Sequence, residues 1–409
     1  MTDRVILHCD CNGFFASVET LLDPTLADVP MAVTGDPNSR HGIILAKNEK
    51  AKAFGIQTAE TIYSAKQKCP QLVCVLSHHR KYEEISQKVN QIYLDYTDLV
   101  DPFGIDESFL DVTGSMKLFG CTPKELADRI RARVKREIGI TISVGVSFCR
   151  VFAKLGSDYK KPDATTVIDR ENYKEVAFPL PVSALLFAGR RTTEALRSLG
   201  ILTIGQLAGA DRALLVARLG EMGDTLWRYA NGLDNEPVHS FYDRPAPKSV
   251  GNGMTFRRDI SGESEIRSGV MTLCDSVAAR LRQEDRKATV VQVQIKTPDF
   301  RVVQRQCTLK RATWLRADLI SNAMALIRAA VGYGTAIRTL TITAAGLVPP
   351  GETEEQLDIF NLAPEEPSKQ EAVEDALAEI HRKYGKGSIT LGLYENPEIG
   401  TGKHHKGHG

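Results

Sequence analysis

The sequence predicts a multidomain α+β protein whose first domain contains a split βαβ (ferredoxin-like) sheet. Three observations predict this fold. Residues 4–148 follow the order strand–helix–hairpin–helix–strand, residues 166–235 are helical with short loops, and a second α+β segment follows a proline-containing linker. The length of 409 residues fits about three domains. With 42% hydrophobic and 25% charged residues, the composition excludes global disorder and a coiled-coil rod.

The first strand is expected at residues 4–9, an apolar run that leads directly into Asp10. A helix that carries Phe14 and Phe15 follows, and residues 43–75 then mix short strands and helices. A carboxylate at the C-terminal end of a central strand is a common place for chemistry. Asp10 is therefore the first candidate site residue.

A helix is expected near residues 80–97, where apolar side chains recur at helical spacing. Residues 99–105 and 108–113 then form the strands of a tight hairpin, with Asp106 and Glu107 at its turn. Because these strands neighbour the first strand in a split βαβ sheet, the acidic pair is expected close to the end of that strand.

The next helix has the clearest start signal in the chain. Thr122, Pro123 and Glu125 provide an N-cap, a proline in the first turn and a capping box, and Gly139 ends the helix. Residues 140–148 alternate between apolar and small polar types, which predicts a half-buried strand. This order of elements places two helices on one face of the sheet.

Charge is distributed unevenly, although the net charge is only +1. Residues 241–350 contain 17 Lys and Arg against 9 Asp and Glu, and residues 351–409 contain 6 against 12. A basic module followed by an acidic tail suggests a polyanionic partner for the module. An ordinary basic surface is the alternative.

The 8 cysteines include no CxxC pair, so we interpret them as reduced thiols rather than a disulfide framework or a zinc site. No apolar run approaches the roughly 18 residues of a membrane span, and the N-terminus lacks the pattern of a secretory signal. These features indicate a cytoplasmic protein that does not enter a membrane.

The carboxylates of Asp10, Asp106 and Glu107 are expected to converge on one point. Converging carboxylates repel one another unless hard cations neutralise them, and Mg²⁺ prefers a few carboxylates together with substrate phosphate oxygens. Two such ions can activate an attacking hydroxyl and stabilise a leaving pyrophosphate. The alternative is that these are turn acids exposed to water.

Four motifs occur in order: residues 10–19, residues 104–113, residues 143–147 with Phe152-Ala153-Lys154, and Lys161-Pro162-Asp163. In sequence and spacing they resemble the Y-family DNA polymerases, the translesion enzymes of the bacterial polymerase IV and UmuC type. The resemblance extends from residue 1 to about residue 350 and implies a right-hand polymerase architecture. It implies a palm (residues 1–18 and 78–165), fingers (19–77), a helix-hairpin-helix thumb (166–235), a linker (236–245), a little finger (246–346) and an acidic tail (347–409).

The resemblance also implies the metal ligands. Asp10 and Asp106 would bind both of two Mg²⁺ ions, Glu107 would bind the catalytic one, and the Cys11 carbonyl would complete a site. The implied reaction extends a primer 3′-hydroxyl on a DNA template with a dNTP and releases pyrophosphate.

Phe15 aligns with the steric gate of this family, whose ring lies under the sugar and would clash with a 2′-hydroxyl. Phe14 would pack beside it, although both residues are also explained as core aromatics of a helix. Lys161 would contact the triphosphate.

The fingers depart from the family pattern. The usual Tyr-x-x-Arg pair that grips the triphosphate is replaced by Glu49 and Lys52, with Lys47 nearby. Lysine is a point charge and cannot form the bidentate fork of arginine. Lys47 and Lys52 are therefore the candidates for nucleotide binding in this segment. Asn12 also stands where the family usually has a second acid, and the thumb hairpin at residues 187–190 has one glycine fewer.

The little finger and the tail carry the expected macromolecular contacts. Seven basic residues are candidates for DNA phosphate contacts, which position DNA without reading its sequence: Lys248, Arg257, Arg258, Arg301, Arg305, Lys310 and Arg311. Gln356, Leu357 and Phe360 resemble the anchors of the bacterial peptide that binds the sliding clamp (its β subunit). The alternatives are a solvated basic face and a tail that folds back on its own domain.

The expected function is low-fidelity, translesion DNA synthesis by a monomer without a proofreading domain. A DNA- and clamp-binding protein that has lost polymerase activity is one alternative, because of the departures in the fingers. A nucleotide cyclase, which shares the palm topology, is another, but the basic little finger and the tail peptide argue against it.

Overall fold

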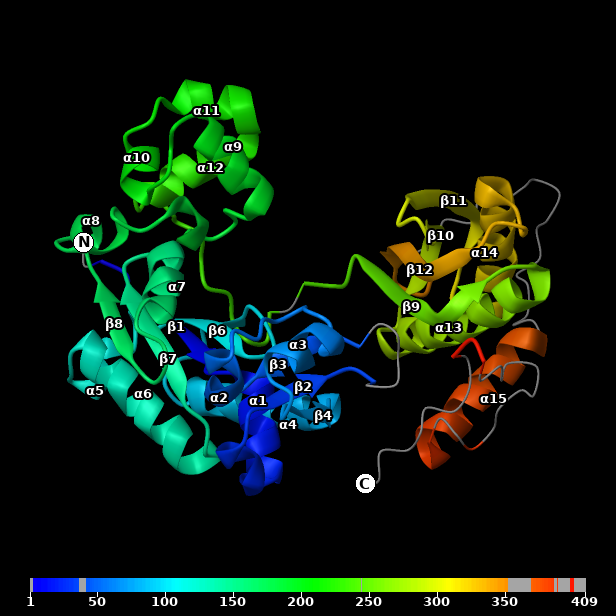
Figure 1. The fold of residues 1–409 in the computed structure, drawn as a ribbon, viewed down its shortest axis with the longest axis horizontal. Coiled ribbons are helices and arrows are strands. Elements are labelled where there is room, and N and C mark those ends of the chain that lie inside the picture. The colour runs from blue at the N-terminus through cyan, green and yellow to red at the C-terminus, as the bar shows by residue number, and fades with distance from the viewer. Residues whose placement is uncertain are drawn as a thin grey trace. The chain divides into compact units, whose positions relative to one another are not determined.

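A computed structural model describes residues 3–36, 42–243, 245–351, 369–385, 388 and 398–400. The chain forms two compact units, Met1–Arg244 and Pro245–Gly409 (Figure 1). None of the helices in the described ranges has the length and apolar character that crossing a membrane requires. The tail peptide at residues 356–360 lies outside the described residues.

The first unit is built around a five-stranded sheet in the order β5-β6-β1-β7-β8. These strands are β5 (Val100–Pro102), β6 (Glu107–Asp111), β1 (Ile6–Cys11), β7 (Ile142–Ser147) and β8 (Thr165–Ile168). All pairs are antiparallel except β7 with β8. The split βαβ prediction is confirmed, since β1 lies between the hairpin strand β6 and the strand β7.

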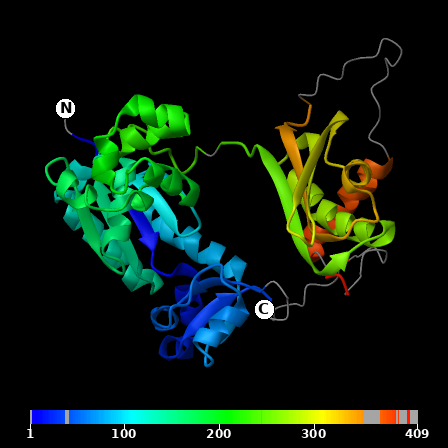
Figure 2. The same ribbon diagram turned by 45° about the horizontal axis from the view of Figure 1, so that its top comes forward.

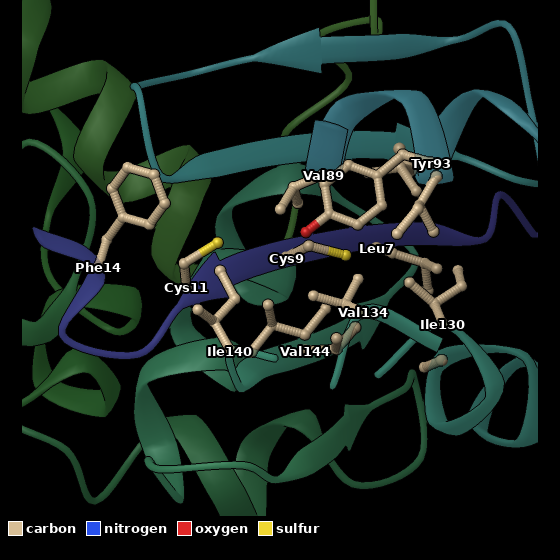
Figure 3. Close-up of a cluster of buried hydrophobic side chains, with 14 of the residues drawn as sticks. Leu7, Cys9, Cys11, Phe14, Val89, Tyr93, Ile130, Val134, Ile140 and Val144 are labelled. Carbon is tan, nitrogen blue, oxygen red and sulfur yellow. The ribbon is translucent and has the colours of Figure 1, made fainter. Parts of the chain in front are cut away.

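Helices α4 (His79–Leu94) and α6 (Pro123–Ile138) cover one face of this sheet. Figure 3 shows Leu7 and Cys9 of β1 pointing toward the apolar side chains of these two helices. The predicted capping box at Thr122 is present, and Gly139 ends α6 with a φ of 86°. Local sequence therefore fixes both ends of α6, because a left-handed φ favours glycine.

The opposite face is covered by α7 (Arg150–Tyr159). The prediction of a half-buried strand at residues 140–148 is wrong in this respect, because all six residues of β7 are buried. The approach of α7 is close: a Cβ on Gly145 would lie 1.8 Å from the carbonyl oxygen of Ala153. Because Gly145 has no side chain, α7 can pack directly on the face of β7 that the alternating pattern predicted to be exposed to solvent.

Two strand boundaries also differ from the prediction. β1 begins and ends two residues later than expected, so Asp10 lies inside the strand. Glu107 is the first residue of β6 and not a turn residue, and it pairs directly with Asp10. The strands extend beyond the apolar runs that predicted them because backbone hydrogen bonds between the strands do not require apolar side chains.

Residues 14–76, most of which the resemblance assigns to the fingers, contain a small sheet in the order β3-β2-β4. Its elements are α1 (Phe14–Leu22), a 3₁₀ turn (Pro24–Asp28), β2 (Met31–Thr34), β3 (Ile44–Lys47), α2 (Glu49–Ala53), α3 (Ile62–Lys68) and β4 (Val73–Leu76). The short helix α5 (Met116–Phe119) lies between β6 and α6.

A cluster of helices follows the five-stranded sheet, which the resemblance assigns to the palm, and these helices were predicted (Figure 1). It comprises α8 (Tyr173–Ala177), a 3₁₀ turn (Val182–Ala184), α9 (Arg190–Ser198), α10 (Ile204–Ala208), α11 (Arg212–Leu219) and α12 (Glu221–Ala230). The segment after α12 packs on the palm: Arg150 Nη1 donates to the carbonyl of Pro237 (2.7 Å), and Val238 is buried. The first part of the expected linker is therefore fixed to the first unit.

The second unit is a four-stranded antiparallel sheet in the order β11-β10-β12-β9, with α13 and α14 on one face (Figure 2). The elements are β9 (Ser249–Ile260), α13 (Glu263–Gln283), β10 (Lys287–Lys296), β11 (Val302–Thr313), α14 (Arg316–Val331) and β12 (Ile337–Val348). A further helix, α15 (Lys369–Tyr384), follows in the second unit. It docks through Glu374, which accepts from Arg282 Nη2 (2.9 Å) and the backbone N–H of Arg316 (3.1 Å).

Candidate active site

A cavity of about 440 Å³ lies between the palm sheet and the fingers segment of the first unit. The palm side contributes the strand ends and the turn that carry the predicted acids, and the fingers side contributes β3 and the loop before α3. The lining residues are Asp10, Cys11, Gly13, Phe14, Phe15, Leu45, Ala46, Lys47, Thr58, Ile105, Asp106, Glu107 and Lys161.

The three predicted carboxylates meet at the palm side of this cavity. Asp10 and Glu107 face each other across the antiparallel pair β1–β6. Asp106 precedes β6, and its backbone carbonyl accepts from the N–H of Cys11 at 2.9 Å. The end of β1 and the turn are thereby held together by the backbone, so the acids converge without depending on flexible loops.

Two lysines neutralise the carboxylates. Lys154 Nζ lies 2.8 Å from Glu107 Oε2 and 3.1 Å from Asp10 Oδ2. Lys161 Nζ lies 2.8 Å from Asp10 Oδ2 and 2.7 Å from Asp158 Oδ1. Burial opposes the charge on both lysines, but the surrounding carboxylates, Asp10 foremost, together outweigh it and raise the pKa of each. The sequence placed Lys154 in one of the four motifs but predicted no role for it, and the fold places it among the acids.

The two neighbouring acids differ electrostatically. Burial, followed by the charges of Asp10 and Glu107, raises the pKa of Asp106. Burial also opposes ionisation of Glu107, but hydrogen bonds from His8 and Lys154 lower its pKa to about 2. Like charges around a partly desolvated acid favour a bound cation, and an oxygen-rich set of carboxylates suits Mg²⁺. The residues present therefore fit a divalent cation.

His8 is a site residue that the sequence did not identify. It is fully buried, with Nε2 3.2 Å from Glu107 Oε2 and Nδ1 2.8 Å from Ser157 Oγ. His8, Asp10 and Glu107 together offer potential ligand atoms within 4.8 Å of one another. A polar residue inside an apolar strand was the available signal, but its partner on α7 is about 150 residues away in sequence.

Asn12, which stands in place of a second acid, connects three segments of the site. Its Nδ2 donates to Ser143 Oγ (2.9 Å), and its Oδ1 accepts from the backbone N–H of Asp163 (2.9 Å). The loop that carries Lys161 is therefore tied to the ends of β1 and β7.

Phe14 and Phe15 both line the cavity, but their surroundings differ. Phe14 is only 3% exposed and belongs to the core cluster of the palm (Figure 3). Phe15 stacks on Tyr82 of α4, with ring centroids 4.2 Å apart and an interplanar angle of 14°. The Tyr82 hydroxyl donates to the buried carboxylate of Glu19. The Phe15 ring therefore lines the cavity and is supported by its stacking contact with Tyr82.

The fingers lysines are not equivalent. Lys47 lines the cavity, with Nζ 3.3 Å from Thr58 Oγ1. Lys52 does not line it and pairs with Glu49 at 3.3 Å. Of the two candidates for nucleotide binding, the structure brings only Lys47 to the other site residues.

Comparison with known proteins places these residues in a family. The model described as the impB/mucB/samB family matches residues 9–158, and that of its C-terminal domain matches residues 247–359. The chain is 41% identical to the DNA polymerase IV of Acetivibrio thermocellus over 390 residues, which cover 95% of this chain and 97% of that protein. It is 33% identical to DNA polymerase IV 1 of Bacillus subtilis over 391 residues, 95% of this chain and 92% of that protein.

The chain belongs to the Y-family of DNA polymerases, in the DNA polymerase IV group. It is a translesion DNA-directed DNA polymerase. A solved Y-family polymerase chimera of Dbh and Dpo4 matches with a TM-score of 0.74 and 20% identity, over 84% of this chain and 99% of the chimera chain. That likeness shows the shared fold.

The predicted DNA-contact residues of this Y-family polymerase are all exposed, on or beside the edge strands β9 and β11. The sheet face away from the helices is polar, with Gln292 and Gln294 beside Gln306 and Gln304, and Lys296 lies on the same face of β10. Arg305 instead pairs with Val293, whose side chain is buried under the helices, so Arg305 lies on the helical side of its edge strand.

Proposed function

We propose that the cavity in the palm is the nucleotidyl-transfer site of this polymerase. In this reaction the primer 3′-oxygen forms a bond to the α-phosphorus of a dNTP, the bond from that phosphorus to the bridging oxygen breaks, and pyrophosphate leaves with the template unchanged. The observation that carries the proposal is the convergence of Asp10, Asp106 and Glu107 with Lys161 in one cavity, while Lys154 pairs with Asp10 and Glu107.

The proposed metal ligands are the carboxylates of Asp10, Asp106 and Glu107 with the carbonyl of Cys11, holding two Mg²⁺ ions. Such ions, when bound, lower the pKa of the attacking hydroxyl and stabilise the leaving group. The chain itself supplies the rigid placement: paired strands fix two of the acids, and Lys154 keeps their charges balanced before substrates arrive.

The nucleotide would lie between the palm acids and the fingers segment. Lys161 would bind the triphosphate close to the acids, with Lys47 and Lys52 as the further candidates. Phe15 would act as the steric gate and Phe14 would support it, because a braced ring cannot retreat from a 2′-hydroxyl.

The proposed domains are the palm (residues 1–18 and 78–165), fingers (19–77), thumb (166–235), linker (236–245), little finger (246–346) and tail (347–409). The exposed basic residues of the little finger would bind phosphates of the primer–template duplex. Gln356, Leu357 and Phe360 would bind the sliding clamp. We further propose that the enzyme is a monomer, works in the cytoplasm where bacterial DNA lies, and copies with low fidelity.

Primer extension tests this function against the alternatives. The wild-type protein should extend a primer most efficiently with the dNTP that the template specifies, and only when Mg²⁺ is present. Asp106→Ala should abolish extension and still bind the primer–template, because DNA affinity depends on the basic surface. A wild-type protein that binds DNA without extending it would support the inactive clamp-binding protein, and cyclic nucleotide formation without extension would support the cyclase.

A further inference from the structure

We propose that Lys47 and Thr58 form the binding site for the distal phosphates of the incoming nucleotide, in place of the Tyr-x-x-Arg pair that is absent here. The inference rests on the proposed function of the cavity. It assigns the task to β3 and the following loop and not to α2, where the family pattern would put it.

The first argument is position within the cavity. Lys47 and Thr58 line it from the fingers, whereas Lys161 and the three acids line it from the palm. A triphosphate bound at the acids through its α-phosphate extends away from them. A cation on the fingers wall is therefore placed for the β- and γ-phosphates, complementing Lys161 at the near end.

The second argument is charge. Lys50 lies 3.4 Å from Asp28, and Lys52 lies 3.3 Å from Glu49, so both lysines of α2 already have a carboxylate partner. Lys47 differs, because among the residues that the structure describes its ammonium group bonds to the neutral hydroxyl of Thr58 and to no carboxylate. Among the lysines of β3 and α2, Lys47 thus has a full charge to offer an anion without first breaking an ion pair.

The third argument is the fixed position of Thr58. Backbone hydrogen bonds tie the two residues after Thr58 to β3: the N–H of Ala59 donates to the carbonyl of Ile44 (2.8 Å), and the N–H of Ile44 donates to the carbonyl of Glu60 (2.9 Å). Ala59 has a φ of 69°, which an alanine adopts only at a cost in strain. Strained residues held in place by their surroundings occur often where a group must be aimed at a ligand.

The acid nearest to Thr58 in sequence does not cancel the positive charge of Lys47. Glu60 is paired with Lys68 at 2.7 Å, and this hydrogen bond lowers the pKa of Glu60. The result is one ammonium group and one hydroxyl, 3.3 Å apart, both able to donate to phosphate oxygens. The Lys47 ammonium and the Thr58 hydroxyl would each donate to a phosphate oxygen, in place of the two parallel hydrogen bonds of an arginine guanidinium. A lysine can take this role because its ammonium group binds phosphate as a point charge.

Nucleotide kinetics on the full-length protein test this assignment. Lys47→Ala should raise KM for the templated dNTP roughly 10- to 100-fold, the loss expected for one charge-assisted hydrogen bond. The inhibition constant of inorganic pyrophosphate should rise with it, because the product occupies the same subsite. Both kcat and the primer–template Kd should change by less than about threefold. Lys47→Arg should restore most of the affinity, and Thr58→Val should give a smaller increase in KM.

Lys50→Ala is the matched control, since it removes a neighbouring lysine that has its own acid partner and does not line the cavity. An unchanged KM for Lys47→Ala, or an increase for Lys52→Ala that equals or exceeds it, would overturn the inference. A wild-type protein that extends no primer would instead refute the proposed function itself. The two failures are therefore distinguishable in the same set of assays.

Discussion

Gly145 offers the sharpest structural test, because it controls how closely α7 approaches the palm sheet. A Cβ at this position would lie 1.8 Å from the carbonyl oxygen of Ala153 and 2.5 Å from the backbone nitrogen of Ser157. Non-bonded carbon atoms pack at about 3.5 Å, and carbon and oxygen only slightly closer, so Gly145→Ala must move α7 by more than about 1 Å. Overpacking of this kind costs about 3 kcal/mol of the free energy of unfolding.

The same movement reaches the active site, since α7 carries Lys154. A shift of about 1 Å takes Lys154 Nζ beyond hydrogen-bond range of Glu107, now 2.8 Å away, and should lower kcat by roughly 100-fold. Denaturant unfolding and single-nucleotide incorporation measure the two effects. Gly114→Ala is the matched control, because a Cβ there has no atom within 4 Å. Wild-type stability and activity in Gly145→Ala would refute the close packing of α7 described here.

Three further predictions follow from other parts of the chain. Phe15→Ala should raise ribonucleotide use, because its ring no longer blocks the 2′-hydroxyl; an unchanged ratio of dNTP to rNTP efficiency would mean that Phe15 is only a core residue. Glu374→Ala should lower the free energy of unfolding of the second unit by about 3 kcal/mol, since it removes the buried carboxylate that accepts from Arg282 and from the N-terminus of α14; the exposed Glu379→Ala on the same helix should have little effect. Alanine at Gln356, Leu357 and Phe360 together should leave extension of a bare primer unchanged and remove stimulation by a loaded clamp; activity lost without the clamp would place the segment on the polymerase itself.

Local sequence signals predicted the elements that depend on local physics. The capping box at Thr122 and the stop at Gly139 need only neighbouring residues, and both are present. The carboxylates were predicted as a site because Asp10 follows an apolar strand and Asp106 and Glu107 lie in a hairpin. A split βαβ sheet places that hairpin beside that strand. Their convergence follows from topology, which the order of elements already indicated.

What the sequence did not reveal depends on contacts between distant segments. The burial of β7 requires α7 on the second face, and nothing in an alternating strand says whether a later helix will cover it. The link from His8 to Ser157 and the pairing of Lys154 with two acids arise from the same helix. The difference between Lys47 and Lys52 likewise needed side-chain positions, because both are lysines in one short segment.

The most direct test of the account is the single-turnover rate of nucleotide incorporation by Glu107→Gln at saturating dNTP and Mg²⁺. The substitution keeps the size of the side chain and removes the charge at the point where β6 meets β1. If the carboxylates hold the metal ions that perform nucleotidyl transfer, the rate should fall by at least about 1,000-fold while the primer–template Kd stays within a factor of about two. A rate within tenfold of the wild-type value, with the same DNA affinity, would contradict the assignment of the catalytic site to these acids.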